Sequence, residues 1–314
     1  MPADLHEPDT SLCDQPSGEA RRGAEDLGGL VDAYGWRVLL TIPDAPYAVQ
    51  CLPSIPYGTA RASSRDWEVA LTLDVLLPEP RPSRPTPAVV YVHGGGWQLG
   101  DKAAGMYPWH SPLMAAHGFV AVNVGYRLSW MAPHPAQQED LKTALTWLRA
   151  NAGTYGIDPS RIGVWGDSAG GHLCSLLGVD QPGTVQAVIA RSAPADLTKI
   201  DLASIDNNAV LGSLAGGPPS QYLDVLRQLS PALNVHGAVP PFLIVHGTND
   251  EIVPFANAEA MVMALRQHAA DVTFHVVQGG KHGLRTDSAP PTDNKLWEGL
   301  GDQALAFFTK HLSQ

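Results

Sequence analysis

The sequence GDSAGG at residues 166–171 holds Ser168 between glycines, which makes this serine a candidate nucleophile. An apolar run, RIGVWG at 161–166, comes before it, and a stretch of helical character at 169–178 follows. Ser168 therefore falls on a predicted sharp turn from strand to helix, which the neighbouring glycines leave room for. Such a turn raises the hydroxyl above the sheet, beside the unpaired N–H groups at the start of the helix.

A serine hydroxyl needs a base, and the base needs an orienting acid. His282 lies in GGKHGL, directly after the predicted strand 272–277, and Asp250 lies in HGTNDEIVP, directly after the predicted strand 241–247. Each of the three side chains follows a different strand, so all three are expected at one edge of the sheet. The sequence predicts Ser168 as nucleophile, Asp250 as acid and His282 as base.

Other polar residues nearby have competing interpretations. The chain holds 12 histidines, and most histidines in proteins are structural. His172 lies in the helix after the serine, where local packing or bonding is the favoured interpretation. His246 and His275 lie inside strand patterns, which favours core or edge positions. Glu251 competes with the preceding aspartate as the acid, but its longer side chain one position later is expected to face elsewhere.

The sequence HGGGW at 93–97 follows a further apolar run, AVVYVH. Consecutive glycines allow the backbone to turn its amides toward a ligand, as stabilisation of an oxyanion requires. Gly94 and Gly95, together with Ala169, are the predicted amide donors. A dinucleotide-binding loop is the alternative, but Leu99 stands where its third glycine would be. The sequence contains neither a Walker A loop nor an HExxH zinc helix, so no metal or organic cofactor is expected.

Strand and helix patterns alternate through most of the chain, which predicts an α/β fold with a mostly parallel central sheet and helices on both faces. A small cap is expected from residues 197–232, where glycines and prolines interrupt the alternation. The proline-rich segment 78–87 is expected to be an exposed connection. The expected strands are 36–42, 68–77, 88–93, 119–126, 161–166, 185–190, 241–247 and 272–277, and the expected helices are 135–149, 169–178, 222–229, 258–265 and 296–311.

Length and charge limit the classes of function. With 314 residues, the chain is expected to form one large domain at 36–314, preceded by an extension at 1–35 that is either a cap or disordered. Its 20 basic and 31 acidic side chains give a formal net charge of −11, which argues against nucleic acid and anionic membranes as partners. The N-terminus lacks the pattern of a signal peptide, and no apolar run is long enough to span a bilayer.

The three cysteines, Cys13, Cys51 and Cys174, form no recognisable framework. Cys174 lies in an apolar helical stretch and is expected to be a buried, inert thiol. An odd number of cysteines is typical of a reducing compartment, and the chain is expected to be cytoplasmic.

HGGGW, YRL at 126–128, GDSAGG, HGTNDEIVP and KHG together resemble the carboxylesterase and lipase branch of the α/β-hydrolase superfamily. The pair HGGG and GDSAGG is shared with hormone-sensitive-lipase-like members. The longer HGGGWQLGDK is closer to carboxylesterases related to feruloyl and acetyl-xylan esterases. The resemblance extends from about Leu71 to Leu312, and it implies the same catalytic and oxyanion residues. One departure is the run SWMAPHPA, where the family often has an aromatic residue and a proline.

The resemblance implies a serine esterase that forms an acyl-enzyme on a small ester. Trp97, Trp109 and Trp130 follow sheet strands and are expected to line the mouth of the site, which favours short-acyl or aryl esters. An amidase of the arylformamidase kind is the alternative enzyme. A non-catalytic small-molecule binder, as in the plant gibberellin receptors, is the alternative of another class. The presence of His282 counts against that binder.

Overall fold

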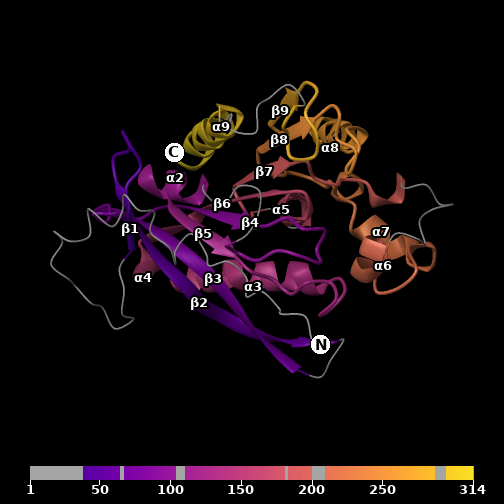
Figure 1. Cartoon of the computed structure of the whole chain (residues 1–314), viewed down its shortest axis with the longest axis horizontal. Coiled ribbons are helices and arrows are strands. Elements are labelled where there is room, and N and C mark those ends of the chain that lie inside the picture. Colours follow the sequence, from indigo (N-terminus) through magenta and orange to yellow (C-terminus); the bar gives the residue numbers. More distant parts are fainter. Residues whose placement is uncertain are drawn as a thin grey trace, which may run out of the picture.

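Buried strands and helices alternate along the chain in the computed structural model, which describes residues 38–63, 67–103, 110–180, 183–199, 209–286 and 295–313. The predicted extension at 1–35 lies outside these residues. The strands of the described part form one sheet (Figure 1). They are β1 (Val38–Leu40), β2 (Ala48–Ala62), β3 (Trp67–Glu79), β4 (Thr86–Val92), β5 (Val120–Val124), β6 (Ile157–Asp167), β7 (Ala187–Arg191), β8 (Phe242–Gly247) and β9 (Val272–Val277).

The order of the strands is β1-β2-β3-β5-β4-β6-β7-β8-β9. The first four strands of this order pair antiparallel, and from β5 onward every pair is parallel. The parallel strands β4, β5, β7 and β8 are mostly apolar without alternation and almost entirely buried, because helices cover both of their faces. The edge strand β9 is largely exposed or half-buried. The mostly parallel sheet with helices on both faces confirms the predicted α/β-hydrolase fold.

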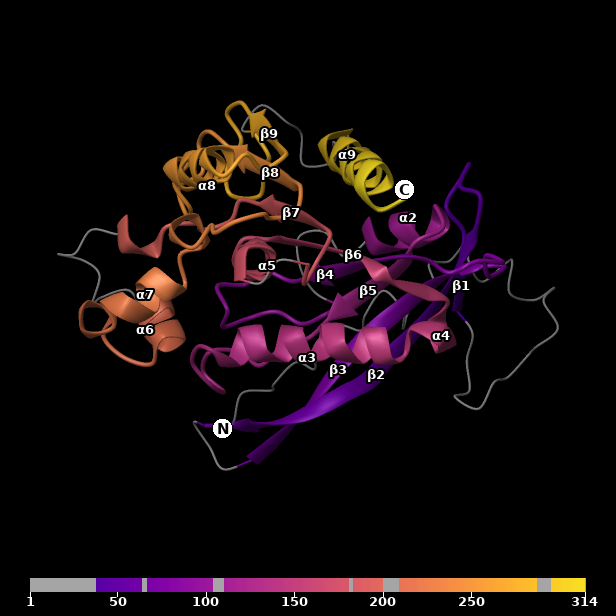
Figure 2. The same ribbon diagram turned by 180° about the vertical axis from the view of Figure 1, so that it is seen from behind.

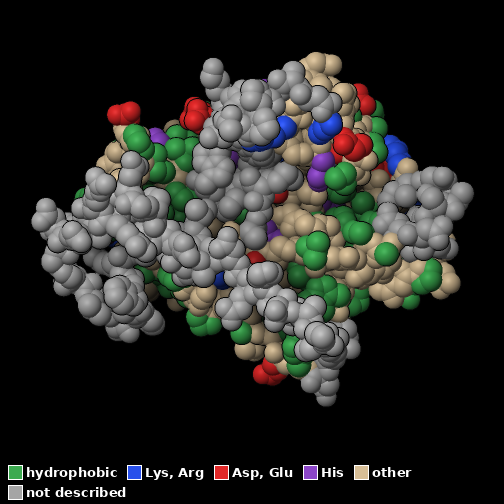
Figure 3. Space-filling model, in the orientation of Figure 1, with side chains coloured by type: hydrophobic (Ala, Val, Ile, Leu, Met, Phe, Trp, Pro, Cys, Tyr) green, Lys and Arg blue, Asp and Glu red, His purple; other side chains and the backbone are tan. Residues whose placement is uncertain are grey.

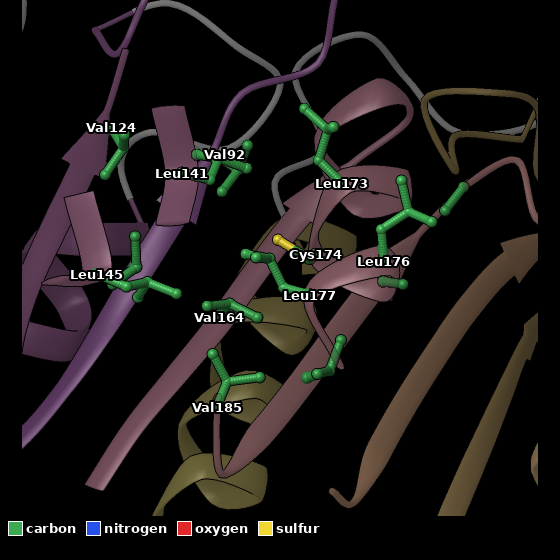
Figure 4. Close-up of a cluster of buried hydrophobic side chains, with 14 of the residues drawn as sticks. Val92, Val124, Leu141, Leu145, Val164, Leu173, Cys174, Leu176, Leu177 and Val185 are labelled. Atoms are coloured by element: carbon green, nitrogen blue, oxygen red, sulfur yellow. The ribbon is translucent and has the colours of Figure 1, made fainter. Parts of the chain in front are cut away.

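Each face of the sheet packs against its own hydrophobic cluster. One contains α3 (Ala136–Ala150), α5 (Ala169–Asp180) and α8 (Ala256–Gln267), and the other contains α2 (His110–Ala116) and α9 (Lys295–Leu312). Figure 2 shows α3 and α9 on different sides of the sheet. Figure 4 shows how leucines of α5 meet valines of the strands in the first cluster. The short helix between α3 and β6 is α4 (Ala152–Tyr155).

The predicted cap region contains two short α-helices in its described part, α6 (Ala209–Ala215) and α7 (Leu223–Gln228), which lie together at one end of the molecule (Figures 1 and 2). The Oγ atoms of Ser213 in α6 and Ser129 are 2.8 Å apart. Since Ser129 follows the carboxyl end of β5, the short helices lie at the carboxyl edge of the sheet. That edge is where sites form in open α/β sheets.

Strand β2 differs from the sequence expectation, which contained no strand between residues 42 and 68. Pro53 and Pro56 disrupt its pattern, and the pairing of β2 with β3 shifts register at both points, between Leu52 and Ile55 and between Pro56 and Gly58. Proline is tolerated in a strand where a bulge removes the need for its missing N–H. A strand interrupted in this way does not alternate regularly, which explains why the sequence pattern did not reveal it.

The cysteines differ in part from expectation. Cys174 is buried and free, and burial raises the pKa of its thiol well above the usual value, as expected for an inert thiol. Cys51, in contrast, is disulfide-bonded. The sequence pattern gave no sign of this pairing of Cys51, and the argument from cysteine count to a reducing compartment loses its basis.

Candidate active site

Ser168 lies at the junction of β6 and α5 with a backbone φ of 53°, a left-handed conformation that L side chains rarely adopt. A residue held in this region costs on the order of 1–3 kcal/mol, which the surrounding structure must offset. Its N–H donates a hydrogen bond to the carbonyl of Arg191, at the end of β7 (2.8 Å). A Cβ at Gly170 would lie 2.0 Å from the carbonyl oxygen of Val92, so only glycine permits this approach of helix to strand.

The structure brings Ser168, His282 and Asp250 into one hydrogen-bonded line. The Oγ of Ser168 lies 3.0 Å from Nε2 of His282. The opposite ring nitrogen, Nδ1, lies 2.9 Å from Oδ2 and 3.1 Å from Oδ1 of Asp250. The three residues follow β6, β9 and β8, respectively, as the sequence predicted.

Two turns hold the predicted acid and the predicted base together. The N–H of Asn249 donates to the carbonyl of Gly280 (2.9 Å), and the N–H of Gly279 donates to Oγ1 of Thr248 (2.8 Å). These bonds connect the turn after β8 to the loop after β9, where the base lies. The relative position of acid and base is therefore fixed by backbone contacts as well as by their own hydrogen bond.

The carboxylate of Asp250 is buried and accepts several further hydrogen bonds. Its Oδ1 receives the N–H groups of Ile252 (3.0 Å) and Val253 (2.8 Å), and its Oδ2 lies 3.2 Å from Nε2 of His246. Burial raises the pKa of Asp250, but the hydrogen bonds from His246, His282 and Val253 outweigh it and hold the pKa well below its usual range. The carboxylate is therefore ionised at neutral pH.

His246 is a partner of the acid that the sequence interpretation missed. It is buried at the end of β8, as expected from its strand pattern, and its Nε2 lies 2.8 Å from the carbonyl of Val253 as well as near Asp250. Both neighbours accept hydrogen bonds, so Nε2 carries the hydrogen. The four-residue spacing between His246 and Asp250 in HGTND was the signal in the sequence that could have revealed this contact. Glu251 is exposed.

The glycines of HGGGW lie directly against the serine turn. A Cβ at Gly94 would lie 2.8 Å from the carbonyl oxygen of Asp167 and 3.4 Å from Cβ of Ser168. The first hydrogen bond of α5 runs from the N–H of His172 to the carbonyl of Ser168 (2.9 Å). The N–H of Ala169 lies before this bond, at the start of the helix, where N–H groups have no acceptor within the helix. The predicted donors Gly94, Gly95 and Ala169 thus belong to two backbone segments that meet beside the serine.

The three predicted tryptophans fall in different surroundings. Trp130 is 46% exposed, and its indole N–H donates to the carbonyl of Gln98 (3.1 Å) in the segment after HGGGW. Trp97 is only 4% exposed, so the expectation that it lines an open mouth is corrected. Its left-handed φ of 59° turns the indole inward, against the imidazole of His172. Trp109 lies outside the described residues.

His172 has one hydrogen arrangement that satisfies its neighbours. The indole N–H of Trp97 lies 3.2 Å from Nδ1, and the carbonyl of Leu229 lies 2.6 Å from Nε2. An indole only donates and a carbonyl only accepts, so Nδ1 is the acceptor and Nε2 carries the hydrogen. The expectation that this histidine packs and bonds locally is confirmed. Burial lowers its pKa to about 4.

The lowered pKa predicts how stability depends on pH. The pKa of His172 falls from 6.5 to about 4 on folding. Above pH 6.5 the imidazole is neutral in both the folded and the unfolded chain, so the fold there has the full stability that this group allows. As the pH falls from there to about 4, the unfolded chain takes up a proton that the folded chain does not. The free energy of unfolding should fall by about 3 kcal/mol through this one group.

Denaturant unfolding of the wild type and of His172→Gln at several pH values between about 7 and 4 measures this contribution. As the pH falls, the free energy of unfolding should decrease less steeply in the variant, and the difference in slope should correspond to at most one bound proton. Equal slopes would show that the imidazole titrates alike in the folded and unfolded chain. His268→Gln, which alters an exposed histidine at the end of α8, provides the control.

The described residues contain no group of three or more His, Cys, Asp or Glu side chains arranged to hold a metal ion. Within the same residues, no helix combines the length and the apolar character needed to cross a membrane. On the face shown in Figure 3, Lys and Arg side chains form only small separate patches among the described atoms.

Several known proteins are similar to this chain. Esterase LipQ of Mycobacterium tuberculosis is 31% identical over 289 residues, which cover 86% of this chain and 64% of LipQ. Esterase LipC of the same organism is 32% identical over 241 residues, which cover 68% of this chain and 57% of LipC. The chain therefore spans less than two thirds of the length of these relatives.

Solved structures share the fold. Esterase 2 of Thermogutta terrifontis with bound propionate superposes with a TM-score of 0.65 at 24% identity, over 81% of this chain and 93% of that one. A truncated carbohydrate esterase from gut microbiota superposes with a TM-score of 0.67 at 23% identity, over 86% of this chain and 99% of that one. The profile of the BD-FAE family matches residues 73–265, which include the serine turn, HGGGW and the predicted acid. The chain belongs to the BD-FAE family, in the carboxylesterase and lipase branch of the α/β-hydrolases.

Proposed function

We propose that the chain is a serine esterase that hydrolyses short-acyl or aryl carboxylic esters through an acyl-enzyme intermediate. One observation carries the proposal: the 3.0 Å contact between Oγ of Ser168 and Nε2 of His282, continued on the other side of the ring by the contact with Asp250. Nδ1–H donates to the buried carboxylate, so Nε2 is free of hydrogen and accepts the serine proton.

The reaction has two symmetric halves. As the serine oxygen attacks the ester carbonyl, His282 takes its proton and Asp250 stabilises the imidazolium. The N–H groups of Gly94, Gly95 and Ala169 are the proposed donors to the oxyanion, each worth about 2.7–4 kcal/mol of transition-state stabilisation where measured elsewhere. The imidazolium then gives its proton to the leaving alcohol, and water attacks the acyl-enzyme by the same route.

Burst kinetics and covalent labelling test the proposal. A short-acyl p-nitrophenyl ester should release one equivalent of p-nitrophenol per chain in a rapid first phase where deacylation limits turnover. Paraoxon should inactivate the enzyme at one phosphoryl group per chain, and mass spectrometry should locate that group on Ser168. Labelling of another residue, or inactivation without labelling, would contradict the assignment.

An exposed apolar cluster beside the glycine loop supports small hydrophobic esters as substrates. Leu99 is 71% exposed, Trp130 donates to the carbonyl of Gln98 next to it, and a Cβ at Gly96 would lie 3.3 Å from a methyl group of Val210 in α6. These side chains surround the loop whose amides are proposed to hold the carbonyl. Contact with an aryl or short-acyl group there would shield apolar surface from water.

Trp130→Ala should raise KM for aryl esters about threefold to tenfold with little change in kcat, because an aromatic contact contributes about 0.5–1.5 kcal/mol beyond burial. Trp67→Ala is the matched control: Trp67 is 45% exposed, but it lies at the start of β3. Steady-state kinetics on phenyl acetate provide the measurement. An unchanged KM in Trp130→Ala would remove this side chain from the substrate site.

An amidase is the second candidate, favoured by one specific similarity. Arylacetamide deacetylase of Bos taurus is 36% identical over 109 residues, which cover 33% of this chain and 27% of that protein. Rates on phenyl acetate, acetanilide and N-formyl aromatic amines separate the two activities. A higher kcat/KM on the amides than on the ester would favour the amidase.

A further inference from the structure

A chain of hydrogen bonds runs beneath the glycine loop through side chains that the proposed mechanism does not use. It begins at the indole of Trp97, passes through the imidazole of His172 on α5 and ends at the carbonyl of Leu229, just after α7. The two rings also meet edge to face, with centroids 5.0 Å apart. Three segments distant in sequence are therefore connected at one buried imidazole.

The backbone of the glycine loop is held in a conformation that an unrestrained chain would leave. Gly95, Gly96 and Trp97 have consecutive positive φ values of 114°, 59° and 59°. Glycine adopts this conformation without cost, but an L residue such as tryptophan does not. The carbonyl of Trp97 accepts the N–H of Ser129 (2.7 Å), so this residue is held through both its main chain and its indole.

Contacts from the predicted cap region reach the same glycine loop from outside. The side-chain amide of Gln98 donates to the carbonyl of Ala209 in α6 (3.2 Å). Leu229 lies in the same predicted cap region and accepts a hydrogen bond from His172. The glycine loop is therefore connected to that region twice, through the exposed side chain of Gln98 and through the buried indole of Trp97. The orientation of the amides of Gly94 and Gly95 then depends on where the indole is held.

We propose that His172 is a positioning residue for ester hydrolysis: it accepts the indole N–H of Trp97 and thereby keeps the amides of Gly94 and Gly95 directed at the oxyanion, while Leu229 fixes the required tautomer. The inference rests on the proposed function of Ser168. Its consequence is that a side chain making no contact with the substrate controls kcat. KM should stay nearly constant, because the oxyanion forms only after binding.

Two substitutions at His172 separate the acceptor from the donor. Asn places its amide oxygen near the position of Nδ1 and keeps an acceptor for the indole, whereas Gln places its amide near Nε2 and keeps only the contact with Leu229. Trp97→Phe removes the indole N–H and retains a ring. Trp97→Phe and His172→Gln should each lower kcat about tenfold with KM within about twofold, and His172→Asn should retain at least about threefold more kcat than His172→Gln.

The double variant Trp97→Phe/His172→Gln should be no slower than either single variant, because both remove the same bond. Trp147→Phe, at a partly buried tryptophan on α3, is the matched control and should leave kcat unchanged. Multiplicative losses in the double variant, unchanged kcat in Trp97→Phe, or equal losses in the Asn and Gln variants would overturn the proposal. Titration with paraoxon counts reactive serines in each variant, so a failure of the proposed function itself would be recognised separately.

Discussion

Ser168→Ala is expected to lower kcat for p-nitrophenyl acetate by about 10⁶-fold, the loss found when the nucleophile of a serine hydrolase triad is removed. The hydroxyl lies 3.0 Å from its base and has no substitute at the same position, because the strained turn presents only this side chain. The glycine loop and the imidazole remain in place, so substrate binding should survive. Steady-state kinetics with purified variant, and binding of a non-hydrolysable ester analogue, measure both effects.

Ser175→Ala is the matched control for this prediction. Ser175 lies two turns further along α5, and its buried hydroxyl donates only to the carbonyl of Gly171 (2.8 Å). Its replacement by alanine should leave kcat within about twofold. Full activity in Ser168→Ala would show that another group performs the chemistry, and the proposed function would then be wrong.

The sequence pointed to the proposed catalytic residues because each follows a strand that could be recognised independently. The strand-like runs before Ser168, Asp250 and His282 are mostly apolar, and they correspond to β6, β8 and β9. Parallel strands end at one edge, so order and strand position together bring the residues close in space. Their actual proximity depends on the two turns that connect through Gly280 and Thr248, which no periodic pattern encodes.

What the sequence did not reveal depends on contacts between distant segments. The burial of Trp97 follows from its left-handed φ and from an imidazole on another element, and neither leaves a pattern along the chain. His246 was assigned to the strand correctly, but its contact with the acid requires the turn after β8. The disulfide of Cys51 is a further case, because cysteine pairing depends on distance in space rather than on spacing in sequence.

Asp250→Asn is expected to lower kcat about 10⁴-fold without loss of the fold, because it changes the hydrogen positions and leaves the shape intact. Oδ1 of the carboxylate accepts the N–H groups of Ile252 and Val253, so the amide oxygen of asparagine must take that place. Its NH₂ group then occupies the place of Oδ2, 2.9 Å from Nδ1 of His282. Because Nδ1 lies closer to this donor than to the retained oxygen, which is 3.1 Å away, the imidazole is expected to accept at Nδ1, which moves its hydrogen to Nε2.

An imidazole with hydrogen on Nε2 has no lone pair there for the serine proton. The variant therefore loses the base although the shape of the site is unchanged. The NH₂ group also meets Nε2–H of His246, which lies 3.2 Å from the replaced oxygen, so two donors face each other and a modest loss of stability should accompany the loss of rate. Glu251→Gln, a neutralised carboxylate one residue away on an exposed side chain, should retain full kcat. Similar losses in both variants would indicate a general effect of negative charge near the site, whereas a loss confined to Asp250→Asn requires the directed hydrogen bond that fixes the tautomer of His282.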